Sequence, residues 1–132
     1  MSVKDDMDKG RKIIEAVFLG GDVNALDELY TPDCVLRTPP FPDINGLTAI
    51  KRATSEMRKI ATIQRIDWEE EIIEGDTAAN RYTIHLKLKN GQDISLHRAA
   101  FLHWKDGKVA EEILYQDYSA ILQLMGNQQA KN

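Results

Sequence analysis

Three glycine-containing turns divide the second half of this chain, and they constrain its fold more than any other feature of the sequence. They are Glu74-Gly75-Asp76, Lys89-Asn90-Gly91 and Lys105-Asp106-Gly107-Lys108, and each separates stretches in which apolar and polar residues alternate. Asn-Gly and Asp-Gly between alternating stretches are strong short-range signals for a β-hairpin. We therefore predict four strands, joined as an antiparallel meander, at residues 62–73, 77–88, 92–104 and 109–118.

The N-terminal part of the chain instead shows helical spacing. Apolar residues recur every three or four positions up to Gly20-Gly21, a pair that ends the first helix. Asp22 is a suitable N-cap for a short second helix. A short strand at residues 34–38 and a proline-rich loop at residues 39–42 follow, and a third helix begins at Gly46. Helices followed by an antiparallel meander predict an α+β fold.

The lengths of the turns predict which side chains face the interior. A three-residue loop ending at Gly91 pairs Leu88 with Gln92 and brings the apolar faces of two strands to the same side of the sheet. A two-residue Asp106-Gly107 loop pairs Trp104 with Val109. The interior residues of the last strand are then Val109, Glu111, Ile113, Tyr115 and Asp117. A three-residue loop there would instead select Glu112, Leu114 and Gln116, and the sequence leaves this alternative open.

This register places three charged residues, Arg98, Glu111 and Asp117, among apolar neighbours on the interior face. One guanidinium cannot fully neutralise two carboxylates, so burial and like charge are expected to raise the pKa of the carboxyl group left over. A raised pKa suits a general acid or base at neutral pH. The alternative is structural: Arg98 and Asp117 form an internal ion pair, and Glu111 reaches solvent at the rim of the sheet.

The remaining reactive residue types indicate neither a metal site nor a nucleophile. His85 has polar neighbours and is expected at the solvent, whereas His97 and His103 share a face expected to meet a partner subunit. No pair of histidines has the spacing of helical metal ligands, and Cys34, beside Val35, is predicted to be a small core residue. We therefore expect no metal and no cofactor.

Composition excludes several classes of protein. With 17 Lys and Arg against 21 Asp and Glu, the net charge of −4 is unlike that of a general nucleic-acid binder. No apolar stretch approaches the roughly 20 residues that a membrane-spanning helix needs. The first ten residues are polar and acidic, unlike a signal peptide, and the single cysteine forms no internal disulfide. We therefore expect a cytoplasmic protein.

The order of two helices, a short strand, a helix and an antiparallel meander is that of the nuclear transport factor 2-like superfamily, and the sequence resembles its SnoaL-like polyketide cyclase branch. The segments that carry the resemblance cover nearly the whole chain: residues 21–36, 45–51, 74–76, 105–112, 116–117 and 122–126. The resemblance implies a cone-shaped, strongly curved antiparallel sheet wrapped around N-terminal helices, with a pocket inside. It also implies a single domain at residues 1–126, with a polar tail at residues 127–132.

The same resemblance suggests which residues act. Asp117 lies where the cyclases of this branch carry an aspartate used as acid and base in an intramolecular aldol closure. The aromatic residue usual four positions earlier is Ile113 here. The general-base aspartate of the related ketosteroid isomerases corresponds to Thr38, and their second acidic residue corresponds to Ala100. The Arg-x-Asp strand motif of limonene epoxide hydrolases is absent from residues 92–104.

We therefore expect a small-molecule pocket protein which, as an enzyme, is a cofactor-free cyclase or isomerase acting on a hydrophobic carbonyl compound. Asp117 would move the proton, and Arg98 or Tyr115 would stabilise the enolate oxygen. The residues expected to line the pocket are Tyr82, Trp68, Trp104, Leu96, Leu102, Ile113, Glu111 and Thr38. The alternative is a ligand-binding or dimerisation module with the same fold and no turnover.

Quaternary structure is predicted from the outer face of the sheet. Phe101 lies on a face that otherwise tends to be polar, together with His97, Ala99 and Leu114. Exposed apolar patches tend to mark interfaces. We therefore expect a homodimer through this face, and no nucleic-acid or membrane partner.

Overall fold

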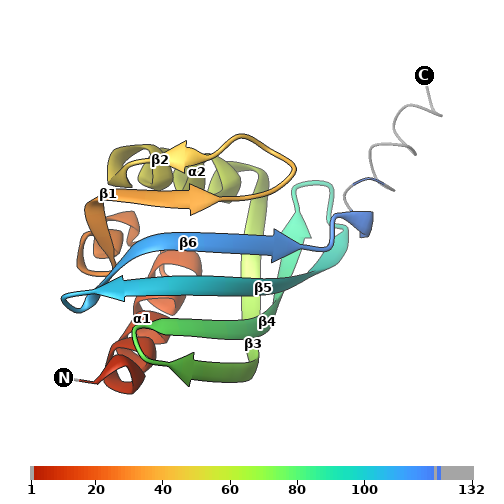
Figure 1. Cartoon of the computed structure of the whole chain (residues 1–132). Coiled ribbons are helices and arrows are strands. Elements are labelled where there is room, and N and C mark those ends of the chain that lie inside the picture. The colour runs from red at the N-terminus through yellow and green to blue at the C-terminus, as the bar shows by residue number, and fades with distance from the viewer. Residues whose placement is uncertain (1, 121, 123–132) are drawn as a thin grey trace.

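The computed structural model describes residues 2–120 and 122, and its elements follow the predicted order with one additional short strand before the third helix. The elements are α1 (Val3–Phe18), the 3-10 helix η1 (Val23–Glu28), β1 (Tyr30–Arg37), β2 (Ile44–Asn45), α2 (Leu47–Ile60), β3 (Ala61–Glu74), β4 (Thr77–Leu88), β5 (Asp93–Lys105) and β6 (Lys108–Gln116). The six strands form one curved, unclosed sheet in the order β2-β1-β6-β5-β4-β3. The predicted α+β class is therefore confirmed, with the helices packed against the concave face (Figure 1).

The two long helices begin and end where local chemistry predicts. The Ser2 hydroxyl caps α1 by accepting a hydrogen bond from the Asp5 amide at 3.2 Å. The chain leaves this helix through Gly21, whose φ of 80° favours glycine. Gly46, with a φ of 90°, precedes α2. After β6, Ser119, Ala120 and Leu122 are helical, and the predicted tail at residues 127–132 lies outside the described residues.

The meander from β3 to β5 matches the prediction. Gly75, Gly91 and Gly107 all adopt positive φ angles in the three hairpin turns. The Leu88 amide donates to the Gln92 carbonyl at 2.8 Å, which confirms the three-residue loop. As a result the even-numbered residues of β4 and β5 face the helices together, and Tyr82 lies directly opposite Arg98.

Bulges supply the curvature of the sheet. β3 is irregular between Ile63 and Arg65 and again between Trp68 and Glu70, and it turns sharply along its length (Figure 1). One pairing differs from the all-antiparallel sheet that was expected, because β1 runs parallel to β6. This pairing adds β1 and β2 to the sheet, and β1 thereby forms a further wall of the space between the sheet and the helices.

The last hairpin corrects the predicted register. Trp104 pairs with Val109 as expected, but a bulge follows, and His103 then pairs with Glu111 and Leu102 with Glu112. An extra residue in one strand reverses which side chains face each side of the sheet. The predicted interior set is therefore wrong beyond Val109, and the alternative set of Glu112, Leu114 and Gln116 faces the helices.

The core lies between the sheet and the helices. Val17, Leu26, Ile84 and Val109 are among its fully buried side chains. Cys34 is also fully buried, as predicted. Burial raises the pKa of its thiol to about 11, so the group is neutral at physiological pH and behaves as a small core residue.

Candidate functional site

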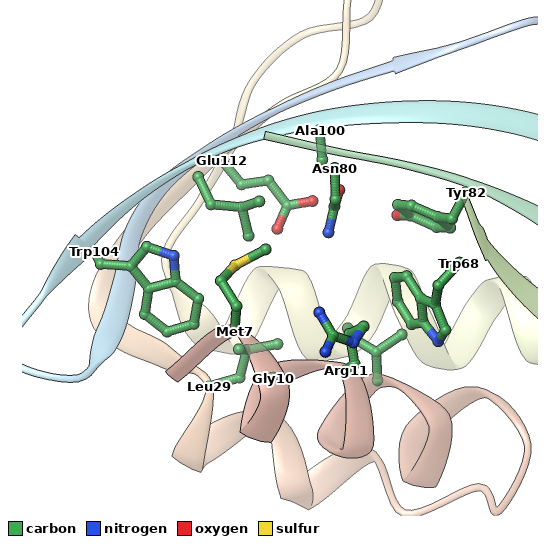
Figure 2. A pocket seen from close by; sticks show the side chains of 12 residues that line it. Met7, Gly10, Arg11, Leu29, Trp68, Asn80, Tyr82, Ala100, Trp104 and Glu112 are labelled. Atoms are coloured by element: carbon green, nitrogen blue, oxygen red, sulfur yellow. The ribbon is translucent and has the colours of Figure 1, made fainter. Parts of the chain in front are cut away.

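Two adjoining cavities lie between the concave face of the sheet and the helices. The large cavity has a volume of about 170 Å³ and is walled mainly by apolar side chains. Its polar members are the hydroxyl-bearing residues Tyr30, Thr38, Thr54 and Tyr82 and the charged residues Arg98 and Glu112. The small cavity, of about 30 Å³, lies between α1 and strands β4 to β6 (Figure 2). Ile14, Tyr82 and Glu112 line both cavities, so these three side chains lie between them.

Glu112, on β6, is the buried carboxyl group of this site. Its side chain points into the space between the sheet and α1 (Figure 2), and the residue is only 7% exposed. The Tyr30 hydroxyl donates a hydrogen bond to Glu112 Oε1 at 2.6 Å. Burial raises the pKa of Glu112, although the Tyr30 hydrogen bond and the positive charge of Arg98 oppose this effect.

Arg98 and Tyr82 form the polar wall next to Glu112. Arg98 is half-buried, and its Nε donates to the side-chain oxygen of Gln116, which holds the guanidinium in place. Burial raises the pKa of the Tyr82 hydroxyl, and the charge of Arg98 opposes that rise. The site therefore combines one buried carboxyl group with one cation and one neutral hydroxyl, the groups needed to move a proton and to stabilise an oxyanion.

Aromatic side chains line the small cavity. The rings of Trp68 and Tyr82 are 4.8 Å apart at their centroids, and Trp68 Nε1 donates to Glu15 at 2.9 Å. Trp104 is 6% exposed, and its Nε1 has no hydrogen-bond partner among the described residues. Asn80 Oδ1 is likewise buried without a partner in this part of the chain. Both residues line the small cavity.

The structure brings together only part of the predicted site. Arg98, Tyr82 and Thr38 lie in the wall of the large cavity, and Trp68, Trp104 and Leu102 lie in the wall of the small one. Leu96 is buried in the core, at 4% exposure, but lines neither cavity.

Four predicted members, namely Asp117, Tyr115, Ile113 and Glu111, do not face the cavities. The bulge turns Tyr115, Ile113 and Glu111 to the outer face, and Asp117 follows the end of β6 at the surface. Tyr115 is 50% exposed, and Glu111 accepts a hydrogen bond from Arg37 at 2.8 Å. The prediction that these residues face the pocket is wrong because one extra residue shifts the alternation.

Asp117 has a local structural role in place of the predicted one. One of its carboxylate oxygens accepts hydrogen bonds from the backbone amide and the hydroxyl of Ser119. These bonds hold the pKa of Asp117 below its usual value. An exposed carboxylate with a lowered pKa is unsuited to proton transfer near neutrality.

Sequence reasoning missed Glu112, Tyr30 and Asn80. Glu112 belonged to the alternative register, so its signal was present but not decisive. Tyr30 and Asn80 carried no recognisable signal in the sequence. Tyr30 lies 82 residues from Glu112 in the chain and contacts it only because β1 pairs with β6.

The histidines lie on the outer face of the sheet. His85 approaches Asp67 at 2.8 Å, His97 lies 3.1 Å from the Thr83 hydroxyl, and His103 lies 3.3 Å from that of Thr77. Within residues 2–120 and 122, no group of three His, Cys, Asp or Glu side chains is arranged to hold a metal ion. None of the helices described is both long and apolar enough to cross a membrane.

Solved structures share this architecture at low sequence identity. A proposed isomerase from Bacillus subtilis superposes with a TM-score of 0.84 at 16% identity, covering 96% of each chain. An epoxide hydrolase of the LEH-like type from M. tuberculosis gives 0.72 at 12% identity, covering 94% of this chain and 95% of the other. IdmH from Streptomyces antibioticus, a proposed polyketide cyclase, gives 0.72 at 16%, covering 90% and 97%. These likenesses show the fold alone.

Sequence comparison assigns the family. The family described as SnoaL-like domain matches residues 11–112, which is more than half of the chain. No curated protein matches the sequence significantly. The matched segment runs from α1 to Glu112, so it includes both cavities' shared residues. The match covers more than half of the chain and therefore shows that this chain belongs to the SnoaL-like domain family.

Proposed function

We propose that the large cavity binds a small, mainly apolar carbonyl compound and that Glu112 transfers a proton to or from it without a cofactor. The observation that carries the proposal is the position of Glu112, a buried carboxyl group with a raised pKa in the wall that both cavities share. A volume of about 170 Å³ is sufficient for a molecule with one ring, since cavities of about 150 Å³ bind benzene.

The surroundings of Glu112 support general acid and base chemistry. A base works best when its pKa lies near the operating pH, and burial moves the pKa of Glu112 in that direction. When a proton leaves the carbon next to a carbonyl group, negative charge develops on the carbonyl oxygen. Arg98 and the Tyr82 hydroxyl line the same cavity and supply a cation and a donor for that oxygen. The Tyr30 hydroxyl stabilises the ionised form of Glu112 between turnovers.

The proposal gives Glu112 the catalytic role that the sequence suggested for Asp117. Several structural neighbours are described as proposed isomerases or as a proposed polyketide cyclase, and proton transfer next to a carbonyl group is one route by which reactions of either kind proceed. The reaction class fits the groups present, because a carboxyl group, a cation and a neutral donor perform it without a metal.

Exchange of hydrogen for deuterium tests this function. Acetophenone is incubated with the protein in D₂O, and the loss of its methyl proton signal is followed by NMR. We expect the wild type to accelerate exchange over buffer, and Glu112→Gln to return the rate to that of buffer while acetophenone still binds. Equal rates for the two proteins would show that Glu112 is not the base. Saturable binding without exchange by the wild type would favour the binding module instead.

We also propose that the chain forms a homodimer through the outer face of the sheet. Phe101 and Tyr115 are 44% and 50% exposed there, and their rings meet edge to face at 6.2 Å. This pair replaces the predicted combination of Phe101 with Leu114, since Leu114 faces the large cavity. A paired aromatic patch of this kind is typical of interfaces.

A further inference from the structure

We infer that the ligand of the large cavity carries a carboxylate group that pairs with Arg98. The inference rests on the proposed function and deepens it, because it narrows the carbonyl compound to one that is also a carboxylic acid. Its basis is a cation that lines a mainly apolar cavity and has no anionic partner among the described residues. A charged side chain in such a place is rare unless something pairs with it.

The sheet brings Arg98 to the cavity from its concave face. Arg98 lies directly opposite Tyr82 on β4 and Gln116 on β6, and all three face the helices. Its Nε donates to the side-chain oxygen of Gln116. Its charge and hydrogen bonding lower the pKa of the Tyr82 hydroxyl, against the effect of burial, so this hydroxyl is also a close neighbour. The guanidinium is therefore held in the cavity wall by side chains that carry no negative charge.

Arg98 differs in this respect from the other arginines that are partly buried. Within residues 2–120 and 122 these are Arg11 and Arg37. Arg11 pairs with Asp8 and with Glu71, and Arg37 pairs with an aspartate and a glutamate as well. None of the ion pairs in the same part of the chain includes Arg98. Its positive charge is therefore available to an anion from outside the chain.

Glu112 lines the same cavity but does not take the place of that anion. The charge of Arg98 acts on it, yet the two side chains form no ion pair, and Glu112 instead accepts its hydrogen bond from Tyr30. Burial raises the pKa of Glu112, so this carboxyl group keeps its proton to a higher pH than an exposed one. A protonated Glu112 does not repel a second carboxyl group.

A carboxylate is the anion that matches this site. The terminal nitrogens of a guanidinium bind both oxygens of a carboxylate in one plane, and such charge-assisted hydrogen bonds are strong. Arg98 is the only cation among the described residues that line the large cavity. A singly charged group is therefore neutralised there, whereas a doubly charged phosphate is not. The mainly apolar wall suits the carbon skeleton of the ligand.

An organic acid can reach this site from solvent. Ala53, in the wall of the same cavity, is exposed, and Arg98 is only half-buried, so the carboxylate is not fully desolvated. With the carboxylate on Arg98, the Tyr82 hydroxyl is the neighbouring donor for the carbonyl oxygen, and Glu112 moves the proton. The substrate is thus a compound that carries both a carbonyl group and a carboxylate.

A matched pair of probes, phenylacetate and phenylacetamide, tests the inference by titration calorimetry at neutral pH. The two share one carbon skeleton and differ in charge. The wild type is expected to bind phenylacetate about ten- to a hundredfold more tightly, because its hydrogen bonds to Arg98 are charge-assisted. Arg98→Gln is expected to abolish this preference. Arg52→Gln removes the same charge from the exposed surface of α2 and is expected to keep it.

A second variant leaves Arg98 in place. Gln116→Glu has nearly the same shape and puts a carboxylate at the atom that accepts the hydrogen bond from Arg98 Nε. This internal anion neutralises the guanidinium and competes with the probe. We expect the affinity for phenylacetate to fall about tenfold or more and that for phenylacetamide to stay within about twofold. The variant therefore tests the charge of the site with the arginine still present.

The outcomes separate the two proposals. A preference for phenylacetate that both Arg98→Gln and Gln116→Glu lose, and that Arg52→Gln keeps, supports the carboxylate site. Equal or tighter binding of phenylacetamide by the wild type, or a preference that Arg98→Gln keeps, refutes the carboxylate site and leaves the proposed function to the acetophenone exchange. A preference that depends on Arg98, without exchange by the wild type, supports the site and counts against proton transfer. No saturable binding of either probe by the wild type refutes the carboxylate site.

Discussion

Replacing Glu112 with Gln is expected to stabilise the protein increasingly as the pH rises. Burial raises the pKa of Glu112 above its usual value of 4.5, so the native state holds this proton more tightly than the unfolded chain does. The protonated carboxyl group therefore favours the fold fully below pH 4.5, and this contribution is lost as the pH rises through the raised native pKa. Gln has nearly the same shape, stays neutral and still accepts the hydrogen bond from Tyr30. The variant therefore does not lose this contribution to stability as the pH rises.

The size of the effect follows from linkage. Each unit by which the native pKa exceeds that of the unfolded chain lowers the wild-type free energy of unfolding by about 1.4 kcal/mol once the group is ionised. In a domain of this length, 1 kcal/mol corresponds to roughly 3–5 °C in Tm. The difference between variant and wild type is expected to be smallest near pH 4 and to reach a plateau above the native pKa.

Urea denaturation between pH 4 and pH 8.5 measures this difference. Glu111→Gln is the matched control, because it changes the neighbouring residue on the opposite face, where a half-exposed carboxylate pairs with Arg37 at 2.8 Å. Loss of that surface pair is expected to destabilise by about 0–1 kcal/mol. A Glu112→Gln difference that stays constant with pH, or that falls as the pH rises, would refute the argument that burial raises the pKa of Glu112.

Four further substitutions test the site, the interface and the core. Tyr30→Phe removes a hydrogen bond that opposes the effect of burial, so the pKa of Glu112 and the pH profile of acetophenone exchange are expected to move to higher pH; an unmoved profile would separate Glu112 from the reaction. Asp117→Asn is expected to leave the exchange rate within about twofold of wild type, since this residue is exposed and bound to Ser119; a large loss would return the catalytic role to it. Phe101→Asp is expected to convert a dimer into a monomer in sedimentation velocity, and an unchanged oligomeric state would count against the interface. Ile84→Ala, at a fully buried position, is expected to lower the free energy of unfolding by about 2–5 kcal/mol in urea, and a loss below 1 kcal/mol would contradict its place in the core.

Local chemistry was sufficient to predict the meander from β3 to β5. The turn at Asn90-Gly91 needs a residue that adopts a positive φ, and Gly91 is that residue. The alternation of Tyr82, Ile84 and Leu86 depends only on the two-residue period of a strand. Both signals lie within a short stretch of sequence. The helices, the hairpins that join β3, β4 and β5, and the register of β4 with β5 were therefore determined by the sequence alone.

Tertiary structure decided the part of the site that carries the chemistry. The turn before β6 formed as predicted, but one bulged residue exchanged the two faces of that strand, so Glu112 and not Asp117 is the carboxyl group that faces the helices. A bulge depends on how β6 fits between β5 and the parallel strand β1, and no local pattern encodes that fit. The contact from Tyr30 to Glu112 and the burial of the Trp104 N–H likewise arise only when distant segments pack together, because burial and hydrogen bonding across 82 residues are properties of the assembled fold.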